Sequence, residues 1–236
     1  RAPSTRRAAL LGLAWGLGCF LTGVSWVYVS LREFGGMAIP LAVIATFLFC
    51  LVLAIFPAMA GGLFARCQTP AQPASPIRQA FFFAGLWTLS EWLRGNVFTG
   101  FPWLAVGYSQ SPPSPLAGWG AVLGVYGLSG LVALIASLGA VLIAQRGKSL
   151  KAWLVIIFIL ASGAVLRHMD WTQPIGKPIT VSLLQGNVPQ SLKWDPKRLA
   201  LSIDTYLQLT QQHPAALTVL PETALPLMFN EVPLDI

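Results

Sequence analysis

The sequence predicts a mostly α-helical membrane bundle followed by the start of a water-soluble α/β domain. Hydrophobic residues make up 55% of the 236 positions and charged residues only 10%, whereas about a quarter of the residues are charged in a typical soluble domain. Long charge-free runs separated by short basic segments continue to residue 168, and the periodicity changes after that point. We therefore assign residues 1–168 to a membrane domain and residues 169–236 to the beginning of a soluble domain.

Five apolar segments are candidates to cross a membrane, because each approaches the roughly 20 residues that the hydrocarbon core requires. In chain order they cover residues 8–30, 34–65, 79–97, 118–144 and 150–166. The third segment contains Glu91 and Arg94, which stand three residues apart. This spacing puts both on one helical face, where we expect them to neutralise each other.

The region between the third and fourth segments cannot continue a helix, because it contains the run Ser-Pro-Pro-Ser-Pro. Residues 99–117 therefore predict a loop at the membrane surface. Trp103, Tyr108 and Trp119 are expected as interface aromatics. Phe101 and Trp103 are also candidates for a lipid-docking floor, and an ordinary aromatic belt is an equally good interpretation of them.

The formal net charge of +7 follows the membrane segments. Residues 1–168 hold 11 Lys and Arg against 2 acids, whereas residues 169–236 hold 4 against 6. We expect no nucleic-acid partner, because basic residues between apolar runs set membrane topology. Eight of the 11 fall on one side of the five segments and three on the other, which predicts that the first side is cytoplasmic and that the soluble domain lies outside.

The three cysteines, Cys19, Cys50 and Cys67, all lie in or at the ends of apolar runs. They have no metal-ligand spacing, so we interpret them as small buried hydrophobes and expect neither a metal nor a cofactor. Nothing indicates an oligomer, and we expect a monomer. The chain begins with Arg1 and has no signal-peptide pattern, so we expect its natural N-terminus to be missing.

The soluble part predicts a strand, a helix and a second strand. Residues 179–183 alternate apolar and polar side chains and lead to a Gln-Gly-Asn turn. Asp195-Pro196 is a plausible helix start, and the helix should end at His213-Pro214. Residues 217–220 form a second apolar run. This order predicts a parallel pair of strands joined by a right-handed crossover.

Glu222 and Trp194 are the candidate site residues of the soluble part. Glu222 follows the second strand, and ligand-binding groups in open α/β sheets lie just beyond the carboxyl ends of strands. A carboxylate that only closes a turn or caps the next helix is the alternative for Glu222. Trp194 lies in a polar loop, where an aromatic residue is more often a packing residue than a substrate contact.

Four stretches in this order resemble the bacterial apolipoprotein N-acyltransferases. They are GVSWVYVS at 23–30, TGFPWL with GYSQ within 99–110, QGN with QSLKWD within 185–195, and LPETALP at 220–226. The resemblance covers essentially the whole chain. It implies a multi-pass protein of the bacterial inner membrane whose periplasmic domain has the nitrilase (carbon-nitrogen hydrolase) fold, an αββα sandwich.

The resemblance also implies a reaction. An acyl chain passes from a phospholipid donor to a catalytic Cys, and then to the α-amino group of the lipidated N-terminal Cys of a diacylglyceryl apolipoprotein. Glu222 would be the general base of a Glu-Lys-Cys triad, and Trp194 would lie near the lipid substrates.

The chain departs from the family pattern at both ends. About two membrane spans before it and one after its soluble part are absent, and no Lys or Cys follows Glu222. The triad Lys and Cys would therefore lie beyond Ile236, and we expect this polypeptide alone to be inactive.

Two other functions remain open from the residues. One is a membrane-anchored nitrilase-type amidase, which would hydrolyse where an acyltransferase transfers. The other is a transporter or membrane scaffold, which Glu91 and Arg94 favour because ionisable groups inside a membrane are functional candidates by default. The chain shows no internal repeat of the kind that many transporters have.

Overall fold

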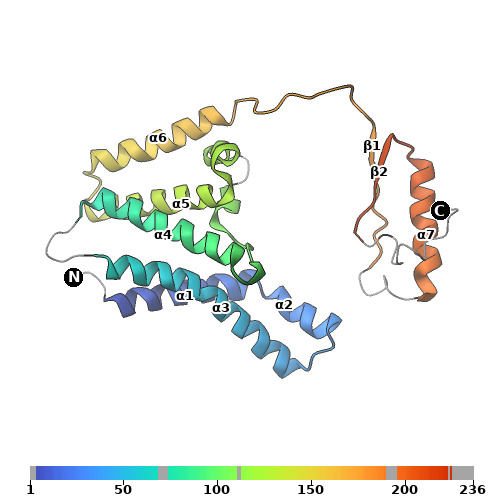
Figure 1. Cartoon of the computed structure of the whole chain (residues 1–236), viewed down its shortest axis with the longest axis horizontal. Coiled ribbons are helices and arrows are strands. Elements are labelled where there is room, and N and C mark those ends of the chain that lie inside the picture. Colours follow the sequence, from blue (N-terminus) through green and yellow to red (C-terminus); the bar gives the residue numbers. More distant parts are fainter. Residues whose placement is uncertain (1–3, 69–73, 111–112, 190–195, 223, 225–236) are drawn as a thin grey trace. The chain divides into compact units, whose positions relative to one another are not determined.

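The structure is a computed structural model that describes residues 4–68, 74–110, 113–189, 196–222 and 224. The chain divides into two compact units, Arg1–Trp171 and Thr172–Ile236. Among the described residues, most of the first unit is helical and the second has two short strands and one helix (Figure 1).

The first unit contains five long helices. They are α1 (Thr5–Gly23), α3 (Ile39–Arg66), α4 (Pro76–Asn96), α5 (Gly120–Ala144) and α6 (Leu150–Leu166). Side-chain caps fix several of their starts: Ser4 and Ser75 each accept a backbone hydrogen bond at 3.3 Å from the residue three positions on. Pro76 follows Ser75 at the first helical position of α4, where its missing N–H costs nothing.

Short elements connect these helices. A short helix, α2 (Trp26–Val29), and a π-helical turn, η1 (Ser30–Phe34), follow α1. The connection from α4 to α5 contains the 3₁₀ turns η2 (Val97–Thr99), η3 (Val106–Gln110) and η4 (Pro115–Trp119). The loop predicted over residues 99–117 is therefore present, with short helical turns in its described part.

The apolar residues form two core clusters. One lies between α4, α5 and α6, and its fully buried centre is Leu138. The other lies between α1 and α3, around Phe20, Val24 and Cys50, and Phe101 and Leu104 from the loop pack against it. Figure 1 shows the same pairing, with α1 beside α3 and α4 beside α5. The loop therefore packs on the α1–α3 pair although it is connected to α4 and α5.

The prediction of five membrane spans is not supported. Among the described residues, two helical stretches are long and apolar enough to cross a membrane: α3 and Pro115–Ala144. A third span is present if α1 and Trp26–Phe34, which are bent by 51° to each other, form one broken span. The fourth helix falls short because it carries Arg78, Glu91 and Arg94. The fifth, α6, has only 17 residues. The predicted segments do become helices, but two or three of them pass as spans.

The second unit holds β1 (Val181–Leu183), α7 (Pro196–Gln212) and β2 (Leu217–Val219). The strands pair in parallel, with Ser182 opposite Thr218, so the predicted strand, helix and strand order and its parallel pairing are confirmed. The first strand is shorter than the predicted run of residues 179–183. Two strands of three residues occur in many α/β folds, so the nitrilase-like αββα sandwich stays a prediction.

Candidate functional site

The carboxyl edge of the two-stranded sheet brings two predicted turns together. β1 runs through Leu184, whose N–H donates to the Val219 carbonyl at 3.0 Å, into the Gly186-Asn187 turn. Asn187 has a φ of 51°. A side chain at Gly186 would come within 2.8 Å of the ring of Tyr206, which is buried on α7. Glycine is therefore needed where this turn approaches the helix.

Glu222 lies three residues beyond the end of β2 at the same edge, because the strands are parallel. The Ala224 N–H donates to the Pro221 carbonyl at 3.1 Å and closes a turn around Glu222, which is exposed. This position is the one predicted for a ligand-facing carboxylate, and it also fits a carboxylate that closes a turn. Trp194 lies outside the described residues, so its predicted place near the substrate stays a prediction.

The buried charges of the first unit attract each other, as predicted, and also form hydrogen bonds with other groups. Glu91 and Arg94 are only 4% and 3% exposed. Glu91 Oε1 accepts from Trp87 Nε1 and from the Val106 N–H, both at 3.1 Å. Arg94 Nη1 donates to the carbonyl oxygens of Phe101 at 2.7 Å and Trp103 at 2.6 Å. The bonds to Phe101, Trp103 and Val106 tie α4 to the loop, in addition to the attraction between the two charges.

Ser129 is a further loop-binding residue that the sequence analysis missed. It is fully buried on α5, and its Oγ accepts from the Gly107 N–H at 2.8 Å. A serine within an apolar helix has no distinguishing sequence pattern. The sequence feature that points to this contact is the GYSQ stretch of the loop, whose Gly107 binds Ser129. Within the described residues, no buried side-chain N or O atom lacks a hydrogen-bond partner, as a stable apolar bundle requires.

The loop aromatics Phe101 and Trp103 lie next to each other, with 6.4 Å between their ring centroids. Phe101 also packs edge-to-face on Phe49 of α3 at 5.0 Å between ring centroids. Trp103 is 53% exposed and lies 5.7 Å from the ring of Trp26. The lipid-docking floor and the ordinary aromatic belt therefore both stay predictions for this pair.

Trp119, expected as an interface aromatic, packs instead against the core between α5 and α6. Its Nε1 donates to the Ile159 carbonyl at 3.0 Å. Tyr108 is 60% exposed, as an interface residue would be.

The cavities in the described part of the first unit differ in size and lining. One of ≈ 450 Å³ lies among α1, α3, α4 and α5, lined by Trp15, Phe64, Phe83, Trp87 and Val106 among others. A second, which adjoins Glu91 and Arg94, has ≈ 10 Å³, room for about one water molecule. The buried charges therefore do not line a path for a solute.

The cysteines do not form a metal site. Cys50 is buried as expected, Cys19 is partly buried and Cys67 is exposed at the end of α3, so the expectation of burial is wrong for Cys67. In the part of the chain that the structure describes, no cluster of three or more His, Cys, Asp or Glu could hold a metal ion.

Known proteins resemble this chain along its whole length. Residues 1–138 match the family described as the apolipoprotein N-acyltransferase N-terminal domain. Proteins named apolipoprotein N-acyltransferase from Nitrosomonas europaea and Ralstonia nicotianae are 47% and 42% identical to it over the entire chain. A third, from Chromobacterium violaceum, is 43% identical over 97% of the chain. The chain covers 46%, 45% and 44% of these relatives, about half of their length. The chain belongs to the apolipoprotein N-acyltransferase family.

Proposed function

We propose that this chain is part of an enzyme that transfers an acyl chain from a phospholipid to the N-terminal amine of a lipidated apolipoprotein. The observation that carries the proposal is the family match, together with a carboxylate at the carboxyl edge of a parallel strand pair. Glu222 is the proposed general base, and the Lys and Cys of the triad are expected beyond Ile236. Trp194 is proposed to contact the lipid substrates.

The chemistry assigned to Glu222 has two steps. It first takes the proton of the cysteine thiol, whose sulfur attacks the donor ester carbonyl; a thioester forms and the lysophospholipid leaves with a proton. In the second step the α-amine of the acceptor attacks the thioester, an amide forms as the C–S bond breaks, and Glu222 passes the amine proton to the leaving sulfur, which regenerates the thiol. The triad Lys would stabilise the oxyanion of both steps.

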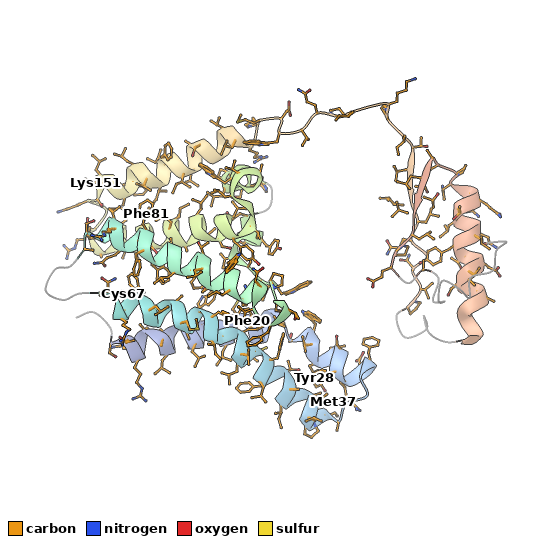
Figure 2. The ribbon with its side chains drawn as sticks, in the orientation of Figure 1. Phe20, Tyr28, Met37, Cys67, Phe81 and Lys151 are labelled. Carbon is orange, nitrogen blue, oxygen red and sulfur yellow. The ribbon has the colours of Figure 1, made fainter. Side chains whose placement is uncertain are left out.

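The proposed location is the bacterial inner membrane, with the second unit in the periplasm. The starts of α1, α4 and α6 and the ends of α3 and α5 lie at one end of the first unit, where Cys67 and Lys151 are seen in Figure 2, and Tyr28 and Met37 lie at the other. The first end has the excess of basic residues, including Arg66, Arg146 and Lys148. Basic residues favour the cytoplasmic side, and α6 runs from that end toward the opposite face.

The transporter alternative loses its main support. Glu91 and Arg94 form hydrogen bonds with the backbone of the loop, and the cavity beside them has a volume of ≈ 10 Å³. The amidase alternative keeps the same triad and differs in the acceptor, which is water where the acyltransferase uses an amine.

One assay separates transfer from hydrolysis. The full protein is incubated with phospholipid vesicles and a synthetic diacylated lipopeptide that has a free N-terminal Cys amine. A gain of one acyl chain on the lipopeptide, shown by mass spectrometry, is the expected result. Release of free fatty acid without acylation of the lipopeptide would support a hydrolase. The 236-residue chain alone should give no turnover, and turnover by it would contradict the triad assignment.

A further inference from the structure

The loop after α4 has a backbone that needs external support. Phe98, Thr99 and Leu104 have φ values of 53°, 72° and 58°, although none is glycine. Side chains other than glycine rarely adopt this region, and such residues persist where the surrounding structure holds them. The loop therefore depends on contacts made from outside it.

Three buried side chains supply those contacts. Arg94 binds the carbonyls on both sides of Pro102, Glu91 binds the Val106 N–H, and Ser129 binds the Gly107 N–H. Arg94 Cζ also lies 5.1 Å from the centroid of the Phe20 ring, which fixes the guanidinium from its other side. Because these groups are buried, water cannot replace them when they are lost.

The arrangement holds the backbone from which the loop aromatics extend. Arg94 binds the carbonyls of residues 101 and 103. The ring of Trp103 contacts those of Phe101 and Trp26, and Phe101 packs on Phe49. An exposed indole pair suits the boundary between acyl chains and headgroups, because indole has an apolar body and a polar N–H.

We propose that Glu91 and Arg94 are positioning residues, which fix the Trp26–Trp103 pair in the orientation that binds the phospholipid acyl donor. The binding part of this inference rests on the proposed function, whereas the positioning part does not. Arg167, at the end of α6, offers a matched control because its Nη1 donates to the Pro113 carbonyl of the same loop through an exposed contact.

The positioning part is tested on this chain in lipid nanodiscs, labelled with fluorinated tryptophan. The protein has nine tryptophans, so the Trp103 and Trp26 resonances are assigned with Trp103→Phe and Trp26→Phe. Arg94→Lys and Glu91→Gln should shift or broaden both resonances and leave that of Trp153 on α6 in place. Arg167→Gln should move neither. Ser129→Ala, which removes one contact without touching a charge, should give a smaller change of the same kind.

An unchanged Trp103 resonance in both Arg94→Lys and Glu91→Gln would overturn the positioning role. If the Trp153 resonance were lost together with that of Trp103, the variant would be generally unfolded, and this result would also count against the positioning role. The exception is a Ser129→Ala variant in which only the Trp103 resonance moves.

The binding part is tested by kinetics of the full protein. Arg94→Lys should raise KM for the phospholipid by about tenfold, the size of one lost charge-assisted hydrogen bond, with kcat within about twofold. A merely structural role would lower the active fraction, and with it kcat, at constant KM. That result would overturn the binding part, whereas shifted resonances in a protein without any acyl transfer would refute the proposed function and leave the positioning role intact.

Discussion

The carboxylate of Glu91 and the guanidinium of Arg94 are almost fully buried in an apolar bundle, an arrangement that is stable only when their hydrogen bonds are satisfied. The sequence spacing predicts that the two charges attract each other, and they do. It does not predict their hydrogen bonds to backbone groups 7 to 15 residues away, because helical periodicity relates only residues within a turn or two of each other. The same limit explains why Ser129 was missed.

Gly100 is the residue that most narrowly constrains the loop. Its φ is 78°, and a Cβ there would overlap the carbonyl oxygen of Gly95 at the end of α4. Gly100→Ala should therefore destabilise the protein by about 1–3 kcal/mol, which lowers the thermal unfolding midpoint in detergent by roughly 5 °C. Gly18→Ala is the control, because nothing lies within 4 Å of that Cβ. Equal midpoints for the two variants would contradict the strain assigned to Gly100.

At the level of elements, hydropathy placed the helices well but overestimated their number as spans. The predicted segment 150–166 coincides with α6, and residues 34–65 largely coincide with α3. The apolar run of residues 8–30 does not predict the break after Gly23, where α1 ends. A side chain at Gly23 would meet the side chain of Leu104 in the loop, and such a contact with a distant loop leaves no periodic trace in the sequence.

The pairing of α1 with α3 depends on small residues. Gly12 and Gly16 stand four apart on α1, the spacing that lets membrane helices approach closely. A Cβ at Gly16 would lie 2.7 Å from Pro57 Cγ and 2.9 Å from Ala54 Cα. Gly16→Ile should separate the helices at a cost of about 1–3 kcal/mol or more and reduce the monodisperse fraction that survives heating, as measured by size-exclusion chromatography.

Gly139→Ile on α5 is the matched control, because the space around Gly139 is open to 4 Å. If it lost as much heat-resistant protein as Gly16→Ile, the effect would come from isoleucine itself rather than from the α1–α3 contact.

For the whole molecule, the distribution of charge predicts which side of the membrane each part occupies. After replacement of the three natural cysteines by serine, Asp204→Cys on α7 and Lys148→Cys before α6 each provide one exposed thiol. A membrane-impermeant maleimide should label the Asp204→Cys variant in intact spheroplasts, and the Lys148→Cys variant only after permeabilisation. The reverse pattern would place the second unit in the cytoplasm and remove the proposed periplasmic chemistry.

The chain divides into its two units after Trp171, and the domain boundary at residue 168 stays a prediction from the change in periodicity. Two features of the sequence point to Glu222: its place after a strand and its match to the family motif. The two short strands confirm its place after a strand and do not test the match.

The central claim is that Glu222 activates the thiol that carries the acyl chain. It is tested most directly by intact-mass spectrometry of the full protein after incubation with phospholipid and no acceptor. The unmodified protein should gain the mass of one acyl chain, and Glu222→Gln, which keeps the size of the side chain but not its basicity, should remain at its original mass while inserting normally into the membrane. An acyl-enzyme that accumulates equally fast in Glu222→Gln would show that this carboxylate is not the general base.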